Sequence, residues 1–208
     1  IFKNIGEYLK QVLNKKTVAN THTLSQDAIT EQDWDCVFKL YIQHQIFLAK
    51  AYGYFELKNE QKFLLAKVFE LLKKTEDNQK KYNKELLSAE ELNNFYYRCY
   101  LSAGQAPNMQ FVLGTRELSN IKCLEEAHKL AQTYEQKFDV LLAMGRHPNQ
   151  TFAVDIGEEL SNIKCLKEAY LLARTDEQKR SLFIPVNNAS KNADLEYFQS
   201  FNNLFEEF

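Results

Sequence analysis

The stretch ELSNIKCLEEAHKLAQTYEQK, residues 117–137, returns as ELSNIKCLKEAYLLARTDEQK, residues 159–179, in a chain of 208 residues. The copies lie 42 residues apart, and 16 of their 21 positions are identical. Upstream, PNMQF from Pro107 matches PNQTF from Pro148. Such a repeat indicates a packing unit that cannot bury its own apolar face, so the copies are predicted to stack on each other.

Each copy carries the signals of two helices. The segments TYEQ, residues 133–136, and TDEQ, residues 175–178, have the form of capping boxes, in which Thr accepts a backbone N–H and Gln reaches back. We therefore predict a longer helix, a sharp turn at Thr and a second, shorter helix in each copy. Weaker similarities at Asn59 and Lys74 extend this pattern toward the N-terminus in degenerate form.

The composition favours helices throughout. Only six Gly and three Pro occur, and 45% of the residues are hydrophobic, so the frequent turns of an all-β protein are missing. The predicted fold class is all-α, a right-handed stack of antiparallel helical hairpins resembling an α-solenoid, with a C-terminal capping helix.

The chain is expected to form one helical domain, residues 1–208, within a larger protein, because it begins with Ile rather than Met. An N-terminal helical segment covers 1–104, the two repeats cover 105–184, and an aromatic helix covers 185–208. Within the first segment, apolar spacing predicts helices near 2–13, 30–48, 60–74 and 76–87, and a further helix that starts at the capping box SAEE, residues 88–91.

Differences between the copies gather on one helix face. Four of the five differing positions recur at intervals of three or four residues, and the repeated Leu and Ala residues lie on the opposite side. An inner side toward the neighbouring repeat and an outer side toward a partner are predicted. The candidate partner-binding residues are Glu125, His128, Lys129, Gln132, Lys167, Tyr170, Leu171 and Arg174.

Two features of the sequence do not fit a simple division of the helix into an inner and an outer side. Leu118 and Ile121 are apolar, but helical spacing places them toward the side on which the copies differ. Either the helix starts later, with Ser119 as its N-cap, or the PNMQF connector covers this end. The C-terminal stripe of DLEYFQSFNNLFEEF, residues 194–208, could instead fold back over the second copy. Tyr170 and Leu171 would then be ordinary core residues.

Motifs of catalysis are missing from the sequence. The histidines are isolated, no phosphate-binding or nucleophile-elbow motif occurs, and the four cysteines show no metal-ligand spacing, so we expect reduced, buried thiols. No catalytic, cofactor or metal site is predicted. The net charge of −2 gives no electrostatic basis for nucleic-acid binding, and no apolar run is long enough to span a membrane.

The repeats resemble α-solenoid families such as the tetratricopeptide proteins, although the 34-residue tetratricopeptide pattern is absent. This resemblance implies a non-enzymatic scaffold that binds another protein. The alternatives are an accessory or regulatory domain of a larger enzyme, or a helical hydrolase or transferase with a site built from distant helices. The composition also resembles effector proteins of intracellular bacteria, which implies a cytoplasmic location, in the host cytosol for a secreted effector. The oligomeric state is left open.

Overall fold

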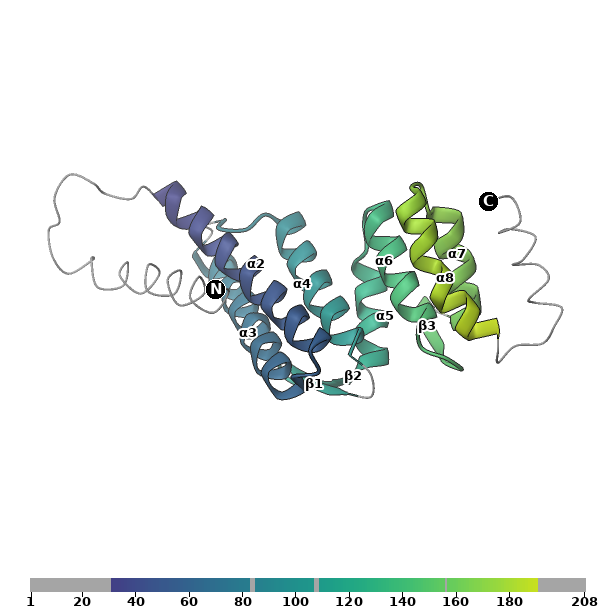
Figure 1. Ribbon diagram of the computed structural model, residues 1–208. Helices are drawn as coiled ribbons and strands as arrows, with labels where there is room; N and C mark the ends of the chain where they lie inside the picture. The colour runs from purple at the N-terminus through teal and green to yellow at the C-terminus, as the bar shows by residue number, and fades with distance from the viewer. Residues whose placement is uncertain (1–30, 83–84, 107–108, 156, 191–208) are drawn as a thin grey trace, which may run out of the picture.

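The structure, a computed structural model, describes residues 31–82, 85–106, 109–155 and 157–190. Its helices stand side by side in an elongated molecule, from α2 and α3 at one end to α7 and α8 at the other (Figure 1). The elements are α2 (Glu31–Tyr54), α3 (Lys58–Tyr82), α4 (Ala89–Gly104), β1 (Gln110–Leu113), β2 (Arg116–Ser119), α5 (Asn120–Leu130), α6 (Tyr134–Gly145), β3 (Thr151–Asp155), β4 (Glu158–Ser161), α7 (Asn162–Leu172) and α8 (Asp176–Ser190). The predicted predominance of helices is confirmed, but the two pairs of short strands were not predicted, so all-α is too strict a description.

The first repeat is preceded by long helices. One continuous helix, α3, takes the place of the two predicted over 60–74 and 76–87, and it ends at Tyr82, before the predicted end at residue 87. Thr75 does not cap a second helix, because its hydroxyl donates to the carbonyl oxygen of Leu71 at 2.9 Å within the same helix. The capping box at Ser88 is confirmed, with Glu91 as its reciprocal partner. The helix predicted over 2–13 lies outside the described residues.

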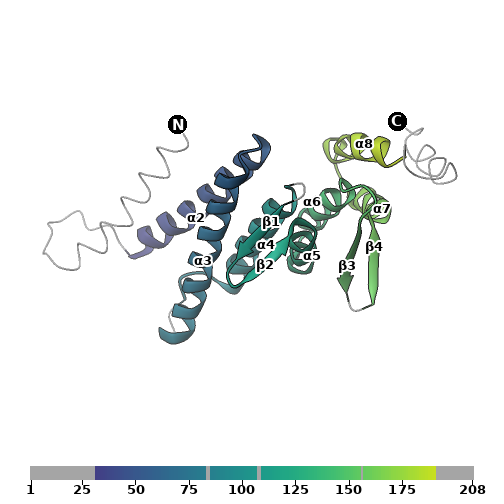
Figure 2. The ribbon, with the colours of Figure 1, turned by 90° about the horizontal axis from the view of Figure 1, so that it is seen from below.

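Each copy begins with an antiparallel β-hairpin. Phe111 of β1 lies opposite Leu118 of β2, and Phe152 of β3 lies opposite Leu160 of β4. The first strand of each hairpin alternates buried and exposed side chains, so β1 and β3 cover core with one face and meet water with the other. Both hairpins lie along the lower edge of the molecule in Figure 1, and Figure 2 views that edge from below.

Glycines close the two hairpins. Gly114 and Gly157 have φ angles of 65° and 81°, in the left-handed region that side chains with a Cβ seldom occupy. The helices that follow start at the N-caps Ser119 and Ser161, which confirms the later start for the first copy. The repeated unit is therefore a hairpin followed by two helices. The helices have 11 and 12 residues in the first copy and 11 and 15 in the second, so the predicted longer-then-shorter order is wrong.

Close helix packing recurs at equivalent positions. A Cβ on Gly104 of α4 would lie 2.5 Å from Cγ of Leu124 in α5, and one on Gly145 of α6 would lie 2.3 Å from Cδ2 of Leu166 in α7. Helices on either side of each hairpin thus approach through a Gly–Leu contact. The repeated residues Leu124 and Leu166 are buried in one continuous core, as predicted for the inner side.

The C-terminal boundary differs from the prediction. Helix α8 runs from Asp176 to Ser190 and therefore crosses the expected division at residue 184. The rest of the predicted aromatic helix lies outside the described residues. Among the helices that the structure describes, none combines the length and the apolar character needed to cross a membrane.

Candidate protein-binding surface

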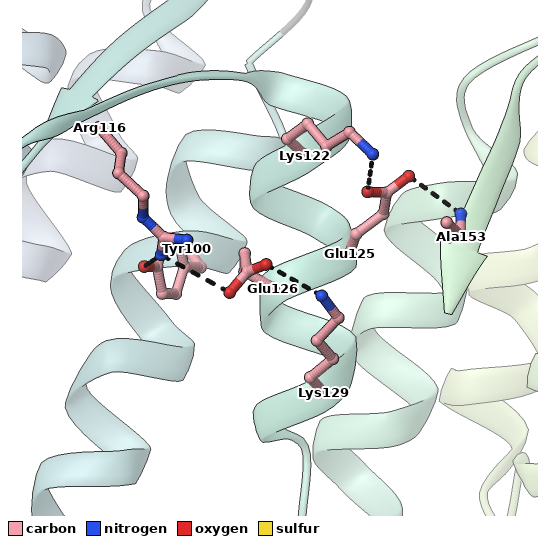
Figure 3. A network of polar contacts seen from close by, with 7 residues as sticks. All are labelled: Tyr100, Arg116, Lys122, Glu125, Glu126, Lys129 and Ala153. Carbon is pink, nitrogen blue, oxygen red and sulfur yellow. Dashed lines mark hydrogen bonds and ion pairs between the residues drawn. The ribbon is translucent and has the colours of Figure 1, made fainter. Parts of the chain in front are cut away.

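Glu125 is buried, against the prediction that its side of α5 faces water. One carboxylate oxygen of Glu125 accepts the backbone N–H of Ala153 in β3 at 2.9 Å, and the other contacts Nζ of Lys122 at 2.6 Å. The second hairpin thus docks over this part of α5 through a charge-assisted hydrogen bond (Figure 3). Glu125 is a contact between the copies, so it is removed from the partner-binding set.

His128 lies one turn further along the same face and is half-buried. Burial lowers the pKa of its imidazole, while the negative charges of Asp155 and Glu158 act in the opposite direction. Since both acids lie at the turn of the second hairpin, that turn lies close to α5.

The remaining candidates differ in exposure. Lys129, Gln132 and Arg174 are exposed, and Leu171 keeps 78% of its surface accessible. Lys167 and Tyr170 are half-buried, and Tyr170 packs against the core. Side chains of the second copy that differ from the first are thus only partly available to a partner.

Tyr134 was not selected from the sequence, although it also differs between the copies. Its exposed ring lies under the guanidinium of Arg174, whose Cζ is 3.8 Å from the ring centroid. This stacking joins the start of α6 to the residues that follow α7, and it holds both side chains in place at the surface. We define the ridge by Lys129, Gln132, Tyr134, Leu171 and Arg174.

A cleft of about 400 Å³ lies at the turn of the first hairpin. Its floor is aromatic: the ring centroid of Phe69 lies 5.0 Å from that of Tyr96 and 5.3 Å from that of Tyr100. The hairpin contributes Leu113 and Arg116. The sequence analysis did not select these aromatic residues, because a helical run of aromatics gives no sign of which hairpin will stand beside it.

Polar contacts surround this cleft. Nη2 of Arg116 donates to the hydroxyl of Tyr100 at 3.0 Å and lies 3.7 Å from Glu126, which contacts Nζ of Lys129 at 3.0 Å (Figure 3). Burial raises the pKa of the Tyr100 hydroxyl, so this group stays protonated at neutral pH. The carboxylates of Glu76 and Glu126 and the cations Lys73 and Arg116 thus share the lining of the cleft.

Residues of the kinds used in catalysis do not converge elsewhere in the described segments. His147 and Asn120 line a second cavity of about 380 Å³, where Nε2 of His147 lies 3.2 Å from the carbonyl oxygen of Gly104. Burial raises the pKa of the Cys123 thiol to about 12, which leaves it protonated and unreactive. Cys36 is exposed, contrary to the expectation that all four thiols are buried. Within the described ranges, no group of three His, Cys, Asp or Glu side chains could hold a metal ion.

Comparisons of this chain with family models, curated proteins and solved structures found no match.

Proposed function

We propose that this chain is a non-enzymatic protein-interaction module. Its repeats are proposed to stack as a right-handed solenoid, with the exposed ridge presented to another protein. The observation that carries the proposal is a contact on the ridge: Tyr134 and Arg174, which both differ between two nearly identical copies, stack at the surface. Leu171, three residues before Arg174, also differs and is exposed. Arg, Tyr and accessible apolar side chains are common anchors of protein interfaces.

The order of elements supports the same proposal. A turn or hairpin followed by two helices is also the order in ankyrin repeats, whose period of about 33 residues is shorter than the one here. Stacked repeats of that kind present extended surfaces to their partners. This is an analogy of architecture, so the ridge carries the functional argument.

The test uses the whole chain, residues 1–208, as bait in lysates, with captured proteins quantified by mass spectrometry. The double variant Tyr134→Ala/Arg174→Ala removes the stacked pair. A matched control, Lys81→Ala/Tyr82→Ala, removes another exposed cation and ring, with Nζ of Lys81 5.0 Å from the centroid of Tyr82. We expect the ridge variant to lose a protein that the wild type and the control both retain.

Melting temperatures of the two variants should be close to that of the wild type, because both pairs are exposed. The ridge proposal fails if the same proteins are captured, at the same levels, by the wild type and the ridge variant.

A further inference from the structure

We propose that the cleft at the first hairpin binds an acidic segment of a protein partner. In this complex a carboxylate of the partner contacts Arg116, and an adjacent apolar or aromatic side chain lies on the floor formed by Phe69, Tyr96 and Tyr100. This inference rests on the proposed function only in taking the ligand to be a protein. No residue of the ridge lines its site, although Lys129 pairs with Glu126 of the lining.

The floor and walls suit a side chain of moderate size. Tyr96 and Tyr100 stand one helical turn apart on α4, and Phe69 of α3 packs against both rings. Leu113 and Leu130 add apolar lining from the hairpin and from α5. A partly open cleft with an apolar floor and a few polar groups at its edge is typical of a ligand site.

The carboxylates of the cleft already have close cationic partners. Glu76 accepts from Nζ of Lys80 at 2.7 Å and from the hydroxyl of Tyr96 at 3.2 Å. Glu126 accepts from Nζ of Lys129 at 3.0 Å. Neither acid therefore depends on Arg116 for its charge balance.

Arg116 keeps donors to spare. Its guanidinium donates to the Tyr100 hydroxyl at 3.0 Å, and its ion pair with Glu126 is 3.7 Å long. Its side chain keeps 56% of its surface accessible. A guanidinium carries five N–H donors in a planar fork that matches a carboxylate, and the Tyr100 hydroxyl fixes one end of that fork. The group is positioned before the ligand arrives, which lowers the entropic cost of binding.

The charges around the cleft favour a carboxylate over a phosphate. Lys73 lies at the rim and pairs only loosely, at 3.7 Å from Glu76 and 3.5 Å from Asp77. The lining itself holds two cations, Lys73 and Arg116, and two acids, Glu76 and Glu126. When their ion-pair partners Lys80, Lys129 and Asp77 are added, the group has one positive charge in excess. One excess charge suits a monoanion, whereas a dianionic phosphate would be repelled by the two carboxylates in the lining.

The second hairpin provides an internal comparison. At the repeat spacings of 41 and 42 residues, Tyr100 corresponds to Leu141 and Arg116 corresponds to Glu158. The copy that keeps the hairpin and its helices thus lacks both the phenol and the guanidinium. These residues are not required by the hairpin fold, which supports a separate role for them in the first copy.

The experiment titrates the ¹⁵N-labelled full chain with N-acetyl-Phe-Glu-amide and follows the amide signals of Gly114 and Thr115 and the side-chain N–H of Arg116. Two matched probes are N-acetyl-Phe-Gln-amide, which lacks the charge, and inorganic phosphate. We expect saturable shifts with the Glu peptide and binding weaker by roughly tenfold or more with the Gln peptide, because a charge-assisted hydrogen bond is lost.

Two variants connect the binding to the cleft. Arg116→Gln should weaken binding of the Glu peptide to the level of the Gln peptide. Tyr100→Phe keeps the ring but releases the guanidinium, so it should weaken binding severalfold while the melting temperature stays close to that of the wild type. Glu158→Gln, at the second hairpin, is the matched control and should leave binding unchanged.

The proposal is overturned if both peptides bind equally, if phosphate displaces the Glu peptide, or if Arg116→Gln binds as the wild type does. None of these results depends on capture at the ridge. The double variant Tyr134→Ala/Arg174→Ala should bind the Glu peptide normally, so the two proposals can fail separately.

Discussion

Helices α5 and α7 share most of their sequence but occupy different surroundings. On α5, the carboxylate of Glu125 accepts a backbone N–H from the following hairpin. At the same position α7 has Lys167, whose ammonium group is a donor only and cannot accept such a bond. The comparison shows that a difference between the copies does not by itself mark a surface residue. A differing position can also be one where the helix of one copy contacts the following hairpin through a side chain that the other copy lacks.

The strongest test of the comparison is removal of the shared core leucine. Leu124→Ala and Leu166→Ala should each destabilise the fold by about 2–5 kcal/mol, since both side chains are fully buried. Leu124 belongs to the copy that lies between helix α4 and the second copy, so its cost should lie toward the upper end. Urea denaturation followed by circular dichroism measures both. Equal costs below 1 kcal/mol would contradict the assignment of these residues to one continuous core.

A smaller effect is expected at the Gly–Leu contact. Replacement of a helical Gly by Ala normally favours the helix, but a Cβ at Gly145 would clash with Leu166. Gly145→Ala should therefore destabilise by about 1–3 kcal/mol, as overpacked cores do.

The double variant Gly145→Ala/Leu166→Ala provides the control for this contact. It should recover part of the loss, because the smaller side chain makes room for the new methyl group. Independent, additive costs in thermal melts would show that the contact does not limit helix approach.

The hydrogen bond between Glu125 and the Ala153 N–H, which distinguishes the first copy from the second, should contribute less to stability than the Gly–Leu contact. Glu125→Ala should cost about 1–2 kcal/mol, because it removes the acceptor of the Ala153 N–H. Lys167→Ala is the matched substitution at the equivalent position and should be less costly. Hydrogen exchange at Ala153 should also become faster in Glu125→Ala alone. If Glu125→Ala leaves both stability and exchange at Ala153 unchanged, the second hairpin does not depend on this hydrogen bond.

Predictions from the sequence succeeded where local signals were complete. The boxes at Ser88 and Thr133 and the inner leucines were identified from spacing alone, and the structure confirms them. The hairpins were missed because their strands are four or five residues long, and their apolar residues merge with the start of the next helix. The alternation of Phe111 and Leu113 before Gly114 was the available signal.

The candidate surface was predicted less well, for a different reason. Helical spacing places Glu125 and Lys129 on the same side of α5, but it cannot show that a hairpin from 28 residues downstream of Glu125 covers one of them. The cleft depends in the same way on Arg116 meeting Tyr100, a contact between a hairpin and a helix. Tertiary contacts of this kind leave no periodic signal in a single sequence.

The smallest expected effect concerns pH and only the first copy, since His128 is replaced by Tyr170 in the second. Burial lowers the pKa of His128 from its ordinary value of 6.5, an effect strengthened by Lys137 and opposed by Asp155 and Glu158. The unfolded chain therefore binds the proton more readily than the folded one. By linkage, the contribution of this residue to stability is complete above pH 6.5 and is lost as pH falls toward and below the lowered pKa.

Thermal melts at pH 7.5 and 5.5 should consequently show a smaller acid-induced loss in His128→Gln than in the wild type. His147, whose pKa is also lowered by burial, contributes with the same sign in both proteins, so the difference between them isolates His128. The difference should be small, because the imidazole is only half-buried and solvent screens its charge. A larger acid-induced loss in His128→Gln would mean that attraction to Asp155 and Glu158 outweighs burial. The hairpin turn would then stabilise the charged imidazole. The second copy, which has Tyr170 at the equivalent position, would lack this attraction.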